Sequence, residues 1–196
     1  MGYTAIFGGT FNPFDNGHFE MLKALCEDAS IDEVFVMPDR IPPHKECEYM
    51  PSDSDRIAMC KLCCDEFYKA KLCLIEFERE GKSYTYDTVL ELKQKYPEKE
   101  FVFVCGGDMF VYLPKWYRYA ELIKLLPFYV FSRIDTEEAE FNKLYNQLSK
   151  KGMEIILNKK VIPNISSTQF RNNPTPSLLP QKVYNYIKER GIYNVR

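Results

Sequence analysis

Short apolar runs alternate along this chain with longer segments in which apolar residues recur every three or four positions. The apolar runs predict β-strands, which fall at 3–7, 33–37, 72–78, 101–104, 128–131 and 153–157. The amphipathic segments predict α-helices, which fall at about 17–29, 54–68, 84–96, 120–126 and 136–151. Two short helices close the chain, the last over about 180–190 and ending at Gly191.

The strands FVFV (101–104) and FYVF (128–131) have no polar residue at alternate positions. Such strands are typical of a parallel sheet that helices cover on both faces. Together with the alternation of strand and helix, they predict a single α/β domain over residues 1–196, a doubly wound Rossmann-like parallel sheet with helices on both faces. Ligands of such sheets bind beyond the carboxyl ends of the strands, so the loops that follow the strands are the candidate binding loops.

Composition narrows the class of protein. The 196 residues are 45% hydrophobic and 28% charged, as in an ordinary globular protein. A net charge of −2 gives no support to general binding of nucleic acid or of a membrane surface, and no run of about 18 apolar residues predicts a membrane span. The chain starts directly on a predicted strand, without a signal peptide, and has an odd number of cysteines, seven. We therefore expect reduced thiols and a cytoplasmic protein.

The segment CKLCC, Cys60 to Cys64, contains a C-x-x-C pair. Such a pair binds metal or performs redox chemistry in some proteins, and in others its cysteines are small apolar residues of a helix. No second C-x-x-C and no nearby histidine completes a zinc site here. The sequence therefore favours buried helical cysteines.

A glycine-rich loop, GGTFNPFDNGH from Gly8 to His18, follows the first strand. Its two glycines allow the backbone to approach a ligand closely, and the N-terminus of the next helix offers N–H groups to an anion. The loop is neither a Walker loop nor a G-x-G-x-x-G motif. His18 either donates a hydrogen bond to a phosphoryl oxygen or has a structural role at the helix start. The glycines before it favour the phosphate.

The segment ISSTQFR, Ile165 to Arg171, has two interpretations. Ser166 followed by Gln169 forms a capping box, which needs no ligand. Ser166, Ser167 and Thr168 also place hydroxyls at a helix N-terminus with Arg171 one turn further, which forms a second anion site. The segment alone leaves both open.

Two further loops carry candidate chemistry. In GKSYTYDT, Ser83 or Thr85 can cap the following helix. In CGGDMFVYLPKWY, the glycines again allow close approach, and Asp108 can accept hydrogen bonds from a ribose. Trp116, the only tryptophan, either stacks on a ring of the ligand or packs as a lid over the core.

These loops resemble, in order and spacing, the motifs of bacterial nicotinate-nucleotide adenylyltransferases of the nucleotidylyltransferase superfamily. The matching motifs are Gly8–His18, Pro42–Lys45, Ser83–Thr88, Gly106–Asp108 with Leu113–Trp116, and Ile165–Arg171. The match covers essentially the whole chain, and the tail LLPQKVYNYIKERGIY resembles the closing helix of that family. Five motifs in register are far more specific than any one of them.

The resemblance implies transfer of the adenylyl group of ATP to nicotinate mononucleotide, with Mg²⁺ on the triphosphate and with those two nucleotides as the partners. It implies catalytic roles for His18, Arg171 and Asp15. It implies an ATP site formed by Gly8, Gly9, Thr10, Phe11, Gly106, Asp108, Arg133, Ser166, Ser167 and Thr168. It implies a nicotinate mononucleotide site formed by His44, Lys45, Tyr84, Thr85 and Trp116. The resemblance leaves open whether the protein forms a homo-oligomer.

Asp15 departs from that family, whose members usually have histidine there. An ionised aspartate cannot donate a hydrogen bond to phosphate and repels it. Three interpretations compete: Asp15 is an oxygen ligand of Mg²⁺, the site tolerates the change, or catalysis is weakened and the protein only binds nucleotides. A preference for nicotinamide mononucleotide is a further alternative. The segment FSRID around Arg133 departs from the Arg-Pro-Gly often found in the family.

Overall fold

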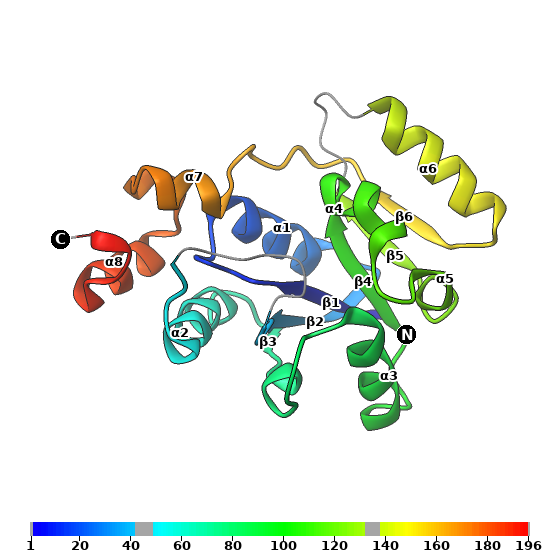
Figure 1. The fold of residues 1–196 in the computed structure, drawn as a ribbon, viewed down its shortest axis with the longest axis horizontal. Coiled ribbons are helices and arrows are strands. Elements are labelled where there is room, and N and C mark those ends of the chain that lie inside the picture. The colour runs from blue at the N-terminus through cyan, green and yellow to red at the C-terminus, as the bar shows by residue number, and fades with distance from the viewer. Residues whose placement is uncertain (1, 42–48, 132–137, 196) are drawn as a thin grey trace.

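A computed structural model describes residues 2–41, 49–131 and 138–195 of the chain. These residues form a six-stranded sheet in which every neighbouring pair is parallel, in the order β3-β2-β1-β4-β5-β6 (Figure 1). The strands are β1 (Tyr3–Gly9), β2 (Ile31–Pro38), β3 (Ala70–Leu72), β4 (Phe101–Gly106), β5 (Phe128–Phe131) and β6 (Ile155–Asn158). The strand order reverses between β1 and β4, which is where ligands of such sheets bind.

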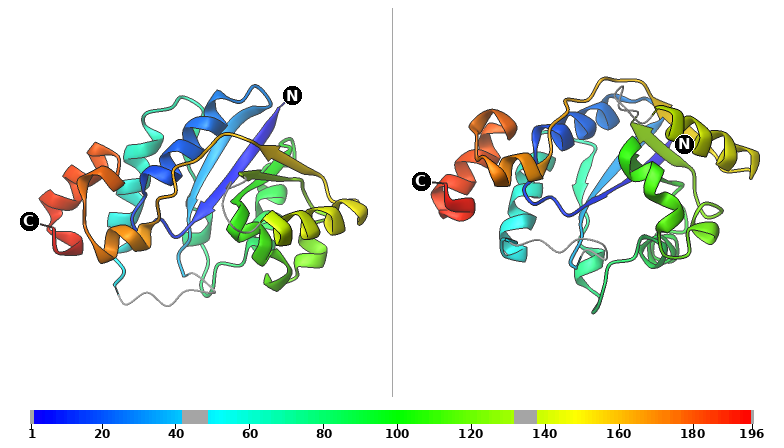
Figure 2. Two further views of the ribbon diagram at one scale, coloured as in Figure 1. Left: turned by 90° about the horizontal axis from the view of Figure 1, so that it is seen from above. Right: turned by 45° about the horizontal axis from the view of Figure 1, so that its top comes forward.

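Helices connect successive strands. The α-helices are α1 (Asn16–Glu27), α2 (Asp53–Cys64), α3 (Thr85–Lys95), α4 (Gly107–Tyr112), α5 (Tyr119–Leu122), α6 (Glu138–Lys150), α7 (Ser167–Asn172) and α8 (Gln181–Arg190). Short 3₁₀ turns include η1 (Ile75–Phe77), η2 (Leu113–Lys115), η3 (Pro176–Leu178) and η4 (Ile192–Asn194). The chain between β6 and α7 crosses from one end of the molecule to the other, so that α7 and α8 lie beside α1 and α2 (Figure 2).

The central strands bury side chains on both faces of the sheet. In β1, Ala5 and Phe7 belong to one core cluster and Ile6 belongs to the other. Helices α1, α2, α7 and α8 contribute to the first cluster, and α3, α4, α5 and α6 contribute to the second. The predicted doubly wound parallel sheet with helices on both faces is therefore confirmed.

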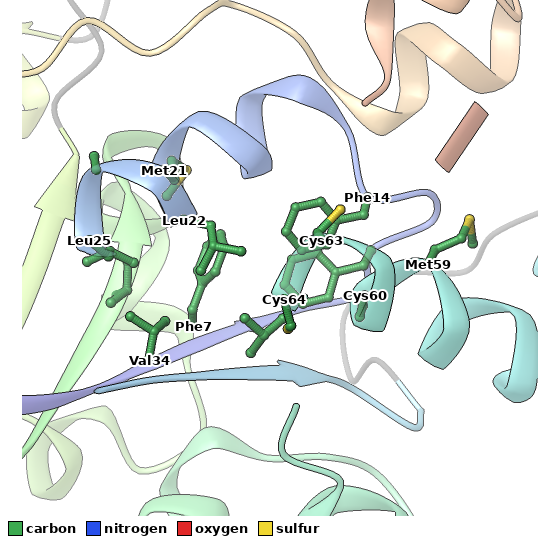
Figure 3. Packing of buried hydrophobic residues seen from close by; sticks show 14 of the residues in the cluster. Phe7, Phe14, Met21, Leu22, Leu25, Val34, Met59, Cys60, Cys63 and Cys64 are labelled. Atoms are coloured by element: carbon green, nitrogen blue, oxygen red, sulfur yellow. The ribbon is translucent and has the colours of Figure 1, made fainter. Parts of the chain in front are cut away.

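The cysteines of α2 belong to the first cluster. Figure 3 shows Cys60, Cys63 and Cys64 in the same packed group as Phe7 and Phe14. Burial raises the pKa of Cys64 to about 12, although Lys61 opposes the shift, so these thiols are protonated at neutral pH and unreactive. The prediction of buried helical cysteines is confirmed.

Several predicted boundaries are wrong. The strand expected at 72–78 is only Ala70–Leu72, and the apolar residues after it form η1, whose Ile75 is buried in the second cluster. Short apolar runs do not distinguish a strand from another buried segment. The helix expected at 120–126 shortens to α5, and α4 begins where a loop was expected. No helix in the described part of the chain is long and apolar enough to cross a membrane.

Candidate functional site

A cavity of about 350 Å³ opens at the carboxyl ends of β1 and β4, where the strand order reverses. Residues of four predicted loops line it: Gly8, Gly9, Thr10, Phe11, Asp15, His18, Tyr84, Thr85, Gly106, Asp108, Trp116, Ser166, Ser167, Thr168 and Arg171. The structure thus brings these candidates together. Three other candidates, His44, Lys45 and Arg133, lie outside the described residues.

A second, more open groove of about 620 Å³ lies between α1, α2, α8 and residues 161–165. Among the residues that the structure describes, no predicted site residue lines this groove. Every predicted site residue that the structure describes therefore lies at the smaller cavity.

Asp15 is the N-cap of α1, and both of its carboxylate oxygens have partners. Oδ1 accepts from the backbone N–H of His18 at 3.0 Å, and Oδ2 accepts from the hydroxyl of Ser167 at 2.8 Å. Burial alone raises the pKa of this carboxyl, but the contacts with His18 and Ser167 outweigh burial and lower the pKa below its ordinary value. Asp15 is therefore an ionised group that holds two segments of the site together.

The imidazole of His18 is held on several sides. Its Nδ1 lies 3.0 Å from Oδ1 of Asp15 and 3.3 Å from the backbone nitrogen of Asp15. The rings of Phe7, Phe11 and Phe14 pack around it at centroid distances of 6.3, 5.1 and 5.5 Å. The ring nevertheless stays 29% exposed, so the side chain reaches the cavity from a fixed position.

Phe11 itself is 1% exposed and stacks on Phe14 at 4.7 Å. Its ring is part of the core beneath the loop. The predicted role of Phe11 in ATP binding, like the other predicted roles, stays a prediction.

Helix α7 has the capping box that the sequence allowed, and Arg171 of the same helix lines the cavity. Ser166 forms the predicted capping box: its hydroxyl accepts from the backbone N–H of Gln169, and the side chain of Gln169 accepts from the N–H of Ser166. Arg171 reaches out of the same helix, with Nη1 2.7 Å from the carbonyl oxygen of Asn12 and Nη2 2.9 Å from the hydroxyl of Thr168. The capping interpretation of Ser166 is confirmed, and Arg171 ties α7 to the glycine-rich loop.

Close packing brings the first turn of α1 against the segment that leads into α7. A Cβ placed on Gly17 would lie 3.1 Å from the carbonyl oxygen of Ile165 and 3.1 Å from Oδ1 of Asp15. A larger residue at Gly17 would push the two segments apart. Glycine at this position therefore serves the approach of two motifs that are about 150 residues apart in sequence.

The sequence did not reveal two residues behind the cavity, Arg56 and Tyr193. Arg56 of α2 is 0% exposed, and its Nη1 donates to the carbonyl oxygens of Thr10 at 3.1 Å and Asp39 at 2.7 Å. Tyr193, near the end of the chain, donates to Oδ1 of the buried Asn12 at 2.6 Å. Arg56 shares the buried face of α2 with Met59, a spacing of three that could have revealed it. No local pattern indicates the contact of Tyr193.

Aromatic rings form the other side of the cavity. Trp116 meets Phe103 edge to face at 5.5 Å, and the ring of Tyr84 lies 4.6 Å from that of Tyr117. Trp116 packs on the second core cluster and also lines the cavity, so its packing on the core is confirmed, and its stacking on a ring of the ligand stays a prediction. Tyr84 is the N-cap of α3 without a side-chain cap bond, which leaves the N-terminal N–H groups of that helix at the cavity.

Acidic residues also line the cavity. Asp108 follows Gly106, the N-cap of α4, and a Cβ on that glycine would lie 2.7 Å from Oδ1 of Asp108. Glu76 of η1 is 5% exposed and accepts from the hydroxyl of Thr88 at 2.8 Å. Burial raises the pKa of Glu76, although hydrogen bonds from Thr88 and Ser83 oppose the shift. The sequence did not indicate Glu76 as a candidate site residue, because Glu76 lies in a segment that was expected to be a strand.

Known proteins of one family are similar to this chain. The family model described as cytidylyltransferase-like matches residues 6–173. The chain is 39% identical over 199 residues to the nicotinate-nucleotide adenylyltransferase of Bacillus subtilis (strain 168), covering 98% of this chain and 99% of that protein. It is 37% identical to the probable nicotinate-nucleotide adenylyltransferase of Lactococcus lactis subsp. lactis (strain IL1403), with 97% and 95% coverage.

A solved structure shares the fold. The nicotinic acid mononucleotide adenylyltransferase of Plasmodium falciparum complexed with NaAD is similar at a TM-score of 0.79 and 21% identity, with 100% of this chain and 99% of that chain covered.

Proposed function

This chain belongs to the nicotinate-nucleotide adenylyltransferases of the cytidylyltransferase-like family, and we propose that it transfers the adenylyl group of ATP to nicotinate mononucleotide. The products are nicotinate adenine dinucleotide and pyrophosphate, in the biosynthesis of NAD. Its partners are then two small nucleotides, and its place is the cytoplasm.

The observation that carries the proposal is the joining of two anion-binding segments at one cavity. His18 at the start of α1 and Arg171 of α7 both line it, and the bonds of Ser167 to Asp15 and of Arg171 to Asn12 hold the two segments together. Two cationic or hydrogen-bonding groups at the switch point of a parallel sheet suit the phosphates of a nucleotide.

In the proposed reaction a phosphate oxygen of nicotinate mononucleotide attacks the α-phosphorus of ATP in line. A new P–O bond forms there, the bond to the bridging oxygen of the β-phosphate breaks, and pyrophosphate leaves with that electron pair. His18 and Arg171 would stabilise the negative charge on the phosphoryl oxygens. Ser166, Ser167 and Thr168 would hold the phosphates, and Asp108 the ribose. Catalysis is then positioning and charge stabilisation without a covalent intermediate.

The acceptor would bind along the aromatic wall. Trp116 would stack on the pyridine ring, and the N–H groups at Tyr84 and Thr85, where α3 begins, would receive the carboxylate. A carboxylate gains more from such donors than an amide does, which favours nicotinate over nicotinamide mononucleotide.

Mg²⁺ would reach the site on the triphosphate, where it neutralises charge on the phosphate oxygens. Mg²⁺ commonly binds to one or two carboxylates, substrate phosphates and water rather than to an all-protein cage. In the described part of the chain no three His, Cys, Asp or Glu side chains gather into a metal site. Both oxygens of Asp15 already accept from protein donors, so we assign Asp15 to the fold of the site and not to the metal.

The test is release of pyrophosphate from ATP and Mg²⁺ with each acceptor. We expect turnover with nicotinate mononucleotide to exceed turnover with the amide at least about tenfold, a difference of about 1.4 kcal/mol. His18→Ala should lower kcat by about a hundredfold or more, the usual cost of losing a transition-state donor. Binding of ATP without any turnover would instead indicate a nucleotide-binding protein, and a larger rate with the amide would reassign the substrate.

A further inference from the structure

A buried carboxyl, that of Glu76 in η1, lies in the wall of the cavity beside the start of α3. Glu76 is 5% exposed and lines the same cavity as Tyr84 and Thr85. Its Oε1 accepts from the hydroxyl of Thr88 at 2.8 Å. The backbone N–H of Thr88 in turn donates to the carbonyl oxygen of Tyr84 at 3.1 Å, within the first turn of the helix. The carboxyl of Glu76 is therefore held against the first turn of α3.

The start of α3 favours a negative charge, but two negative charges there repel each other. N–H groups and the helix dipole attract an anion to a helix N-terminus. The N–H groups at Tyr84 and Thr85, which we propose for the carboxylate of the acceptor, belong to the same turn that Thr88 joins to Glu76. Burial of Glu76 limits the screening of the repulsion by water. An acceptor carboxylate therefore binds better while Glu76 is protonated.

The surroundings of Glu76 favour its protonated form. Burial raises the pKa of this carboxyl, although hydrogen bonds from Thr88 and Ser83 oppose the shift. A carboxylate that already resists ionisation takes up a proton readily when a second negative charge arrives.

Charged groups from several segments surround Glu76 in the described part of the chain. Asp39, which follows β2, raises the pKa of Glu76, and Arg79, which follows η1, lowers it. The guanidinium of Arg56 lies 5.9 Å from the ring centroid of Phe77, the next residue. The same cavity is also lined by Asp15, His18, Asp108 and Arg171. These groups are the same whichever acceptor binds, so they do not distinguish an acid from an amide.

We propose that Glu76 is a specificity-determining residue that couples binding of the acceptor's carboxylate to uptake of a proton, so that the protonated carboxyl admits the acid acceptor and the ionised one repels it. The proposal rests on the proposed function for the acceptor and its orientation. The proton comes from the solvent and joins a carboxyl oxygen of Glu76, and no bond of the ligand changes. The preference for nicotinate over nicotinamide mononucleotide is then full below the pKa of Glu76 and decreases as pH rises through it.

The first experiment measures binding without ATP, so that it does not depend on catalysis. Calorimetry gives the dissociation constants of nicotinate and nicotinamide mononucleotide between about pH 5 and pH 9, a range that a raised carboxyl pKa enters. Both ligands carry the same phosphate, so its titration cancels in the ratio of the two constants. We expect this ratio, the preference for the acid, to fall about threefold or more as pH rises, because one charge comes to oppose another.

Glu76→Gln removes the charge and keeps an oxygen that can accept from Thr88. Its preference for the acid should stay constant over the same pH range, at or above the wild-type value at low pH. A preference that falls equally in both proteins, or that stays constant in the wild type, overturns the proposal. So does a wild-type protein that binds neither mononucleotide.

The second experiment counts protons. Binding enthalpies measured in buffers of different ionisation enthalpy give the number of protons taken up with each ligand. At the pH where the preference changes most steeply, the wild-type protein should take up about 0.2 proton or more with the acid beyond its uptake with the amide. Glu76→Gln should show no such difference. A purely structural role of Glu76 would leave the number of protons the same for both ligands, and that result would contradict the proposal.

The matched control is Glu78→Gln, which removes the same charge two residues away. Glu78 is the C-cap of η1, is 59% exposed and pairs with Lys95 at 3.1 Å. Water screens an exposed charge, so this variant should keep the pH dependence and the proton uptake of the wild type. If neither mononucleotide supports release of pyrophosphate, the proposed function fails, while the binding measurements still decide the proposal about Glu76.

Discussion

The two sides of the cavity are built from different interactions. On the side that we propose for the phosphates, the phosphate side, which comprises Asn12, Asp15, His18, Ser167 and Arg171, directed hydrogen bonds join segments from both ends of the chain. On the side that we propose for the acceptor, the acceptor side, which comprises Tyr84, Trp116 and Tyr117, ring contacts dominate. A phosphorus centre needs its partners at fixed distances and angles, whereas a flat ring needs an apolar wall of the right shape.

The two sides of the cavity also differ in the interactions behind the cavity surface. Main-chain carbonyls of the glycine-rich loop accept from three remote side chains: Thr10 from Arg56, Pro13 from Ser167 and Asn12 from Arg171. The loop is thereby fixed before any ligand binds, which avoids the cost of ordering it at each turnover. The acceptor side, in contrast, exposes 46% of Tyr117. We therefore expect losses of stability to be largest when the supports of the phosphate side are removed.

Removing Arg56 should break the phosphate side most severely. Besides the carbonyls of Thr10 and Asp39, this buried guanidinium contacts the carboxylates of Asp39 at 3.3 Å and of Asp53 at 2.8 Å. Arg56→Met keeps the apolar stem but removes every donor, and each of the carbonyls of Thr10 and Asp39 left without its donor costs about 1–3 kcal/mol, a total of about 2–6 kcal/mol. Urea unfolding measures this loss.

The control for Arg56 lies on the same helix. Lys61 pairs with Asp65 at 2.9 Å, and their side chains are 63% and 56% exposed. Lys61→Met should cost no more than about 0.5 kcal/mol, as is usual for an exposed helical pair. Equal losses in the two variants would contradict the view that Arg56 supports the glycine-rich loop.

How far the sequence predicts each side follows from the range of the interactions. The glycine-rich loop, the capping box of Ser166 and the sheet with helices on both faces are encoded in local patterns, and the structure confirms them. The contacts of Asp15 with Ser167 and of Tyr193 with Asn12 join residues more than 150 positions apart. No local pattern encodes such contacts, because they depend on how the finished fold brings segments together.

Asp15 is an instructive intermediate case. Its sequence context, an aspartate three residues before His18, is that of a helix N-cap. The sequence suggested roles for the charge of Asp15 toward phosphate and Mg²⁺ alone, because the resemblance to a family directed attention to the missing histidine. The structure shows a capping box and a partner in α7. The local sequence is sufficient to predict the capping contact of Asp15 with His18. It is insufficient to predict the contact with Ser167.

A smaller loss is expected from Tyr193→Phe. The hydroxyl of Tyr193 donates to Asn12, whose carbonyl oxygen in turn accepts from Arg171. Leaving the buried amide oxygen of Asn12 without this donor costs about 1–3 kcal/mol. Because Asn12 also positions Arg171, the KM for ATP should rise by about threefold or more, which corresponds to about 0.6 kcal/mol.

A second buried tyrosine provides the comparison. The hydroxyl of Tyr129 donates to Asp28 at 2.7 Å and accepts from Asn158 at 2.6 Å, and Tyr129 does not line the cavity. Tyr129→Phe should lower the free energy of unfolding by a similar amount, about 1–3 kcal/mol, with an unchanged KM for ATP. A KM that rises equally in both variants would show that general loosening, and not the position of Asn12, affects ATP binding.

The finest difference is the sign of the response to pH of two buried carboxyls in the cavity wall, Asp15 on the phosphate side and Glu76 outside that side. The pKa of Asp15 is lowered from its ordinary 3.8, because the contacts with His18 and Ser167 outweigh burial, so its stabilisation is present above that value and is lost as pH falls through the lower folded value. Burial raises the pKa of Glu76 above its ordinary 4.5, so ionising it weakens the fold increasingly as pH rises through the raised value.

Urea unfolding between about pH 3 and pH 7 of two amide variants separates these opposite signs. Relative to wild type, Asp15→Asn should lose stability as pH rises through the acid range, because it lacks the favourable ionisation. Glu76→Gln should gain stability over wild type as pH rises, because it avoids ionising a buried carboxyl. Curves that move in the same direction would mean that the two buried carboxylates share one environment, and that the contrast between Asp15, held by directed bonds, and Glu76, dominated by burial, is wrong.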